Sequence, residues 1–221
     1  MTTATTTHLY VLIDRSGSME SIADDVIGGF NQLIVEQQAN GADARMTVVQ
    51  FDSQDPHGVM YAGIPILEMT RLDRSVYQPR GGTPLLDATG LLIGRAKVEQ
   101  SARVATGLAA EDVVFVTITD GQENESREYN LAKITQLIES CKQDGWTFVY
   151  VSGALDAYHD AAQIGYDQGG TQHFAATADG AQKAFRSVSR NMSNLRDKKR
   201  RGEHYDATNF FETGKDAEED Q

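Results

Sequence analysis

Two apolar runs that each stop at an aspartate restrict the fold of this chain more than any other feature of its sequence. Residues 8–13 run up to Asp14, and residues 112–119 run up to Asp120. Short runs of this kind are typical of strands buried on both faces of a parallel sheet. Helical patterns separate the strand-like runs. Together they predict an α/β fold, a doubly wound and mostly parallel sheet with helices on both faces.

The remaining elements follow from the same periodicities. The run 59–67 contains Gly63 and Pro65, which weaken a central strand, so we expect it at an antiparallel edge. We expect further strands at 45–51, 147–151 and 171–175, and helices at 21–38, 84–98, 130–143, 156–164 and 180–195.

The charge of the chain is concentrated at its carboxyl end. The whole chain has 20 basic and 32 acidic residues, a net charge of −12. Residues 203–221 hold seven acids and one lysine, a net −6, and residues 196–201 have a net +4. We therefore expect a flexible start at 1–7, one domain at 8–195 and a solvated, disordered tail at 196–221, in which Phe210 and Phe211 could dock.

Composition excludes several classes of protein. The single cysteine, Cys141, cannot form an intrachain disulfide or a cysteine-based zinc cluster. No window reaches the roughly 18 apolar residues of a membrane span, and residues 1–7 lack the features of a secretory signal, so we expect a cytoplasmic protein. The acidic balance argues against nucleic acid and anionic membranes as partners.

Three short motifs carry oxygen donors and lie at strand ends or before a helix. Asp14, Ser16 and Ser18 follow the first strand, Thr83 lies in a Gly-Gly-Thr-Pro loop, and Asp120 lies in Thr-Asp-Gly. In a doubly wound sheet, ligands bind beyond the carboxyl ends of the strands. Two carboxylates and three hydroxyls are hard donors that suit Mg²⁺ or Mn²⁺.

Each motif taken alone also has a simple structural interpretation. Ser18 can cap a helix, Thr83 can cap the helix after Pro84 with or without binding a metal, and Asp120 can be a turn residue. Three more acids lie near the same predicted edge and are expected to support the site without binding the ion directly: Asp52, Asp87 and Glu123.

Taken together, the three motifs resemble the metal-ion-dependent adhesion site (MIDAS) of von Willebrand factor A (vWA) domains, most closely the small stand-alone bacterial members. The resemblance covers roughly residues 8–195, and it implies a Rossmann-like fold. It also implies an ion held by Ser16, Ser18 and Thr83, with Asp14 and Asp120 acting directly or through water. The implied ion is Mg²⁺, with Mn²⁺ or Ca²⁺ possible.

The resemblance implies a binding module and no catalytic residue. An open position on the ion would take an Asp or Glu of a partner protein, or a carboxylate of this chain's own tail, from Glu218, Glu219 or Asp220. The alternative is a Mg²⁺- or Mn²⁺-dependent phosphoester hydrolase that uses the same site. The sequence lacks an Asp-x-Asp after the first strand, a phosphate-binding loop and a Gly-x-Ser-x-Gly elbow, which disfavours that alternative.

Overall fold

The computed structural model describes residues 6–211, and its centre is a sheet with the strand order β3-β2-β1-β4-β5-β6. All neighbouring strands are parallel except β2 and β3, which are antiparallel. The expected mostly parallel sheet with one antiparallel edge strand is therefore confirmed. The strands are β1 (Thr7–Asp14), β2 (Ala44–Asp52), β3 (Asp55–Pro65), β4 (Asp112–Thr119), β5 (Thr147–Ser152) and β6 (Thr171–His173).

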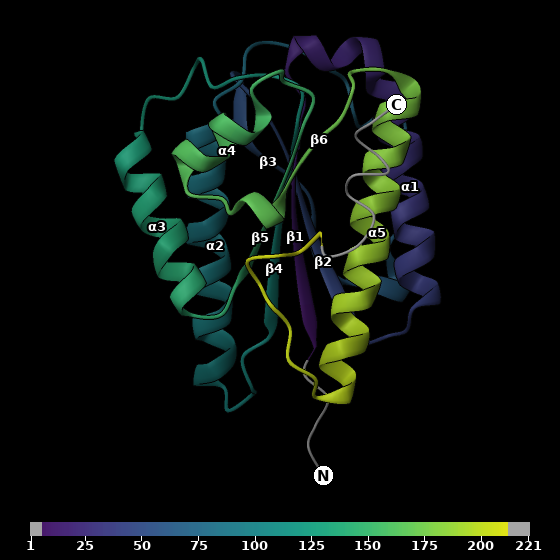
Figure 1. Cartoon of the computed structure of the whole chain (residues 1–221), viewed down its shortest axis with the longest axis vertical. Helices are drawn as coiled ribbons and strands as arrows, with labels where there is room; N and C mark the ends of the chain where they lie inside the picture. The colour runs from purple at the N-terminus through teal and green to yellow at the C-terminus, as the bar shows by residue number, and fades with distance from the viewer. Residues whose placement is uncertain (1–5, 212–221) are drawn as a thin grey trace.

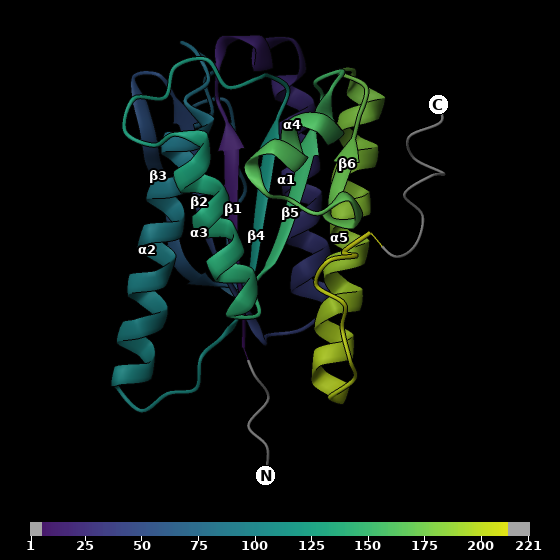
Figure 2. The ribbon, with the colours of Figure 1, turned by 60° about the vertical axis from the view of Figure 1, so that its left-hand side comes forward.

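Helices cover both faces of this sheet, α1 and α5 on one face and α2, α3 and α4 on the other (Figure 1, Figure 2). Side chains of β1 alternate between the two cores: Leu9 and Val11 pack toward α1 and α5, whereas Tyr10 packs toward α2 and α3. The helices are α1 (Ala23–Ala39), α2 (Leu85–Ala105), α3 (Leu131–Gln143), α4 (Ala157–Ile164) and α5 (Ala178–Arg201), and a 3₁₀-helix, η1 (Gly17–Ile22), precedes α1.

Two helices run further than the apolar pattern predicted. Helix α2 ends at Ala105 instead of near residue 98, and its last turns expose Val98 and Val104. Helix α5 continues through the basic run to Arg201 and ends at Gly202, whose φ of 66° suits a glycine cap. No helix within residues 6–211 has the length and apolar character needed to cross a bilayer.

The predicted domain end at residue 195 is too early, because α5 continues to Arg201. Residues 202–209 are exposed or half-buried, and the docking expected of Phe210 and Phe211 is observed. Arg196 is fully buried, and both Phe210 and Phe211 are buried in the core beneath α5. The segment after α5 runs back along that helix, and the main-chain N–H of Phe211 donates to the carbonyl of Gly169 at 2.9 Å (Figure 2). At the other end, Thr7 is a buried residue of β1. Residues 1–5 and 212–221 lie outside the described part of the chain, so the predictions for them stay predictions.

A buried cluster of charged side chains lies at the amino ends of the parallel strands. Glu111, whose side chain is 1% exposed, accepts hydrogen bonds from Arg45 Nε at 2.8 Å, from Gln100 Nε2 at 2.8 Å and from the ring of His8 at 3.3 Å. Burial by itself would raise the pKa of Glu111, but these hydrogen bonds outweigh it and lower the pKa to about 2. The ionised carboxylate is therefore a stabilising part of the fold.

Replacing Glu111 with Gln is expected to cost about 3 kcal/mol of unfolding free energy at pH 7. The folded-state pKa lies below the ordinary value of 4.5, so this stability is present above pH 4.5 and is lost as the pH falls toward 2. Urea unfolding at pH 7 and at pH 3 measures it: the gap between wild type and Glu111→Gln should narrow at pH 3. The exposed Glu68→Gln is the control. A gap that stays constant with pH would contradict the prediction.

Candidate metal centre

The three predicted motifs meet at the carboxyl edge of the sheet. Strands β1 and β4 are neighbours in register, with Ile13 opposite Ile118. Asp14 therefore lies beside the end of β4 at Thr119, and Asp120 follows directly. The order of the strands reverses here, because the chain leaves β1 toward β2 on one side and later returns to β4 on the other. The loop that contains Thr83 is held against the loop after β1 by a hydrogen bond from the N–H of Gly17 to the carbonyl of Gly81 at 3.0 Å.

Asp14 is fully buried at the base of this site. Its Oδ1 accepts from the main-chain N–H of Ser16 at 2.7 Å, and its Oδ2 accepts from the hydroxyl of Thr119 at 2.5 Å. Burial raises the pKa of Asp14 to about 6; these hydrogen bonds lower it in part, and the nearby charge of Asp120 raises it. Each oxygen keeps an acceptor position for an ion or a water.

The hydroxyls lie in a chain that leads from Ser16 to Asp120. Ser16 Oγ and Ser18 Oγ are 3.1 Å apart, and Ser18 Oγ donates to Asp120 Oδ1 at 2.7 Å. Thr83 joins them across Gly121: a Cβ on this glycine would lie 3.3 Å from Thr83 Oγ1 and 3.7 Å from Ser18 Oγ. The structure therefore brings all five predicted donor residues to one place.

The donor set fits a small divalent cation. Mg²⁺ binds oxygens at about 2.0–2.1 Å in an octahedron, which places adjacent ligand oxygens roughly 2.9 Å apart. The spacings of 3.1 and 2.7 Å match such edges. Burial also raises the pKa of Asp120, and no cationic side chain is among the largest influences on the pKa of either aspartate. Two adjacent carboxylates whose ionised forms burial disfavours are the electrostatic setting that a cation relieves.

Within residues 6–211, no cluster of three or more His, Cys, Asp or Glu side chains could hold a metal. The site described here has two carboxylates, and its other donors are hydroxyls. This composition favours Mg²⁺ and its hard relatives over zinc.

The simple capping interpretations of two donors are wrong. Ser18 lies inside η1, and its hydroxyl bonds Asp120 instead of a helix N-terminus. Helix α2 begins after Pro84, and the carboxylate of Glu123, not Thr83, accepts the N–H of Leu86 at 2.8 Å. Both hydroxyls are thus available for the site.

The three supporting acids have structural partners of their own. Asp52 binds Arg15 and Arg80, and Glu123 caps α2. Asp87 accepts three main-chain N–H groups of residues 127–129, which holds the loop after Asp120 against α2. They therefore shape the loops around the five donors, as expected.

Sequence reasoning missed three residues that position the donors. Thr119 binds Asp14, the hydroxyl of Tyr77 donates to the carbonyl of Asp14 at 2.5 Å, and the side-chain oxygen of Asn124 accepts the N–H of Thr83 at 2.8 Å. Thr119 directly precedes Asp120, so its position was a usable signal. Tyr77 and Asn124 lie in loops whose paths the sequence does not reveal.

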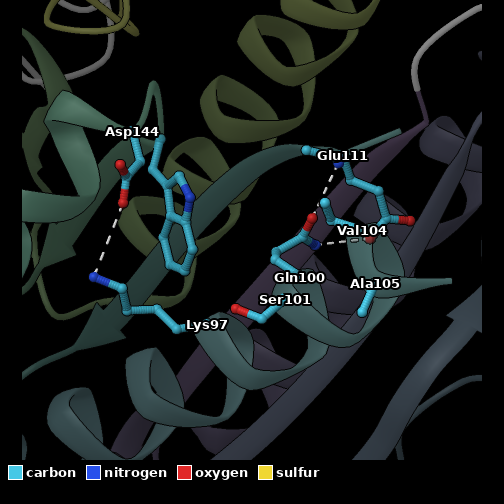
Figure 3. Close-up of a pocket in the computed structure, with 9 residues that line it drawn as sticks. Lys97, Gln100, Ser101, Val104, Ala105, Glu111 and Asp144 are labelled. Carbon is cyan, nitrogen blue, oxygen red and sulfur yellow. Dashed lines mark hydrogen bonds and ion pairs between the residues drawn. The ribbon is translucent and has the colours of Figure 1, made fainter. Parts of the chain in front are cut away.

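A cavity lies beside the loops that follow Thr83 and Asp120. It has a volume of about 330 Å³ and is lined by Leu85, Leu86, Gln122 and Glu123. A larger one, of about 500 Å³, lies at the opposite edge beside Glu111 (Figure 3). There Gln100 binds Glu111, and Lys97 lies 3.9 Å from Asp144.

Comparison with known proteins places the fold. No protein-family model matches the chain, and no curated protein matches it in sequence. Among solved structures, the pilus adhesin SpaC of Lactobacillus rhamnosus GG in its open conformation superposes with a TM-score of 0.63 at 12% identity, over 86% of this chain and 30% of the adhesin. The chain therefore matches less than a third of that adhesin's length.

Two further structures share this fold. Proximal thread matrix protein 1 of the mussel byssus gives a TM-score of 0.53 at 13% identity, over 86% of this chain and 46% of its own. Manganese-loaded TRAP of Plasmodium vivax gives 0.53 at 15% identity, over 81% of this chain and 71% of its own. With its doubly wound sheet and its antiparallel edge strand, the chain has a vWA-like Rossmann fold.

Proposed function

We propose that this chain is a cytoplasmic, divalent-metal-dependent protein-interaction module of the small stand-alone type. Ser16, Ser18 and Thr83 would hold Mg²⁺, with Asp14 and Asp120 as direct ligands or through waters. The observation that carries the proposal is the convergence of these donors from three separate loops, two of the donors being carboxylates whose pKa burial raises. One structural neighbour, TRAP of Plasmodium vivax, is loaded with manganese, which adds support for a divalent ion.

The charge balance explains why a partner carboxylate would bind there. Two aspartates and a divalent ion sum to zero, so the ion keeps its attraction for one more anion, and a partly dry site strengthens that attraction. Mg²⁺ commonly keeps exchangeable waters, which an incoming Asp or Glu can replace. The bound ion supplies an electrophilic position for this exchange, and no covalent bond is broken. The chain's own acids Glu218, Glu219 and Asp220 lie outside the described residues, and binding by them stays a prediction.

Replacing Ser18 with Ala should weaken the metal response of the protein. Mg²⁺ or Mn²⁺ at a hundred times its Kd should stabilise folded wild type by about 2.7 kcal/mol, so the protein should melt at a higher temperature than with a chelator. Ser18→Ala removes one donor and should need a higher ion concentration for the same rise. Ser21→Ala is the matched control, because Ser21 is exposed on the same 3₁₀-helix and its hydroxyl reaches only a main-chain carbonyl at 3.4 Å.

Two results would contradict the proposal. One is a melting temperature that Mg²⁺, Mn²⁺ and Ca²⁺ all leave unchanged; the other is an equal metal response in Ser18→Ala and Ser21→Ala. The same samples also test the hydrolase alternative. We expect wild type and Asp14→Ala to hydrolyse p-nitrophenyl phosphate and ATP at the same background rate. Hydrolysis by wild type that is lost in Asp14→Ala would support the hydrolase.

A further inference from the structure

Arg80 lies on the same loop as the donor Thr83 and is fastened to the first ligand loop. Its main-chain N–H donates to the carbonyl of Arg15 at 2.8 Å, one residue from both Asp14 and Ser16. The next residue, Gly81, accepts from Gly17. The backbone of Arg80 is therefore held in place at the rim of the proposed metal centre.

The side chain of Arg80 is anchored as well. Its Nε donates to Asp52 Oδ2 at 2.9 Å, and Asp52 is fully buried at the end of β2. No described residue accepts a hydrogen bond from the two terminal NH₂ groups of Arg80, and the side chain is 44% exposed. A guanidinium that is fixed at Nε and open at its NH₂ groups is preorganised to bind an oxyanion.

The local charge also permits an anion. One carboxylate, Asp52, faces two guanidinium groups, since Arg15 binds it through Nε at 2.7 Å. These three side chains sum to +1, and Asp55, opposite Asp52 in the pairing of β2 with β3, brings the local balance close to neutral in a chain whose total is −12. The cluster lies next to a metal centre that is neutral when loaded, so an acidic partner would meet two favourable positions side by side.

The separation of the two positions limits the spacing of the acids that could fill them. Asp14 pairs in register with Phe51, so Asp52 follows on the neighbouring strand, about 4.8 Å away, and the guanidinium of Arg80 lies one hydrogen bond of 2.9 Å beyond its carboxylate. An extended peptide rises about 3.3 Å per residue. Acids roughly one to three residues apart would therefore reach both positions.

We propose that the partner is a protein segment with two nearby acidic residues, one carboxylate for the metal and a second that Arg80 binds through its terminal NH₂ groups. The proposal rests on the function proposed above and adds the chemistry that selects the partner. Because the second carboxylate needs no metal contact, Arg80 would choose among segments that all supply the first.

The test starts from an unbiased probe. A displayed library of random peptides is selected on the full-length protein with Mg²⁺ and again with chelator. We expect Mg²⁺-dependent enrichment of peptides with two acids within about three residues. Enriched peptides are then synthesised in three forms: with the second acid unchanged, with its amide, and with phosphoserine in its place. The affinity of each form is measured for wild type, Arg80→Gln and Arg80→Lys. Arg71→Gln is the control, because it removes the same charge from an exposed residue.

A thermodynamic cycle gives the decisive result. The amide should bind wild type about tenfold more weakly than the acid, and Arg80→Gln should lose the same factor for the acid but nothing more for the amide. Arg80→Lys should recover part of the affinity, and Arg71→Gln should behave as wild type. The effect should shrink in high salt. All affinities are measured at saturating Mg²⁺, so that a change in the affinity for the ion does not enter the cycle.

The outcomes separate the two proposals. If the Mg²⁺-dependent peptides contain only one acid, and wild type and Arg80→Gln bind them with equal affinity, Arg80 has no such role. The proposed metal-dependent module would then remain. Phosphoserine binding far more tightly than the acid would show that the position selects phosphate, against the carboxylate proposed. Absence of any Mg²⁺-dependent enrichment, together with no metal shift of the melting temperature, would overturn both proposals.

Discussion

Replacing Asp14 with Asn is expected to raise the melting temperature of the chelator-treated protein and to abolish its further rise with Mg²⁺. Burial raises the pKa of Asp14 to about 6, so the ionised carboxylate at pH 7.5 costs the metal-free fold about 1–3 kcal/mol. An amide removes this cost and can still accept from Ser16 N–H, while the hydroxyl of Thr119 can turn to the carbonyl of Gly121, 3.2 Å away. For a domain of this size the gain corresponds to roughly 2–10 °C.

The dependence on pH provides a second check of the same variant. A raised folded-state pKa means that the cost of Asp14 is complete above pH 6 and disappears as the pH falls toward 3.8, the ordinary value. The gap between Asp14→Asn and wild type in chelator should therefore close between pH 7.5 and pH 4. Asp156→Asn is the matched control, since Asp156 is exposed, follows β5 at the same edge and makes no side-chain cap hydrogen bond. A variant Asp14→Asn that still responds to Mg²⁺ would remove Asp14 from the site.

Replacing Arg196 with Leu is expected to lower the free energy of unfolding by about 3–5 kcal/mol. The reason is that the buried oxygens of Gln37 lose their donor, and the half-buried Gly41 carbonyl and Asp43 each lose a hydrogen bond. The guanidinium is fully buried and donates to the carbonyl of Gln37 at 2.9 Å, to the carbonyl of Gly41 at 2.7 Å and to Asp43 Oδ1 at 2.5 Å. These bonds join α5 to the end of α1 and to the loop before β2. Urea unfolding followed by circular dichroism measures the loss.

Arg200→Leu is the matched control for this prediction. Arg200 binds the same carboxylate, Asp43, at 2.7 Å, but its side chain is 33% exposed, so its removal should cost no more than about 1 kcal/mol. Equal losses in the two variants would show that burial of Arg196 does not set its contribution.

The order of strands and helices was predictable from sequence because it depends on local periodicity. Apolar runs that end at Asp14 and Asp120 predict parallel strands, and parallel strands place their carboxyl ends at one edge. The motifs that contain Asp14 and Asp120 therefore had to meet there, and the structure brings Ser16, Ser18 and Asp120 into one hydrogen-bonded chain. Thr83 follows the antiparallel β3, so only the tertiary structure decided its place beside them. Gly63 and Pro65 likewise predicted the edge position of β3, which is confirmed.

Only the tertiary structure decided which charges are buried and what each acid binds. The basic run at 196–201 has the pattern of a solvated segment, yet Arg196 is buried because its acceptors come from residues more than 150 positions away. In the same way, Asp52 could be placed near the site, but its pairing with Arg15 and Arg80 could not. A local pattern records the period of a helix or strand; the partners of a charged side chain depend on contacts between distant segments, which form only when the sheet and its two helical layers assemble.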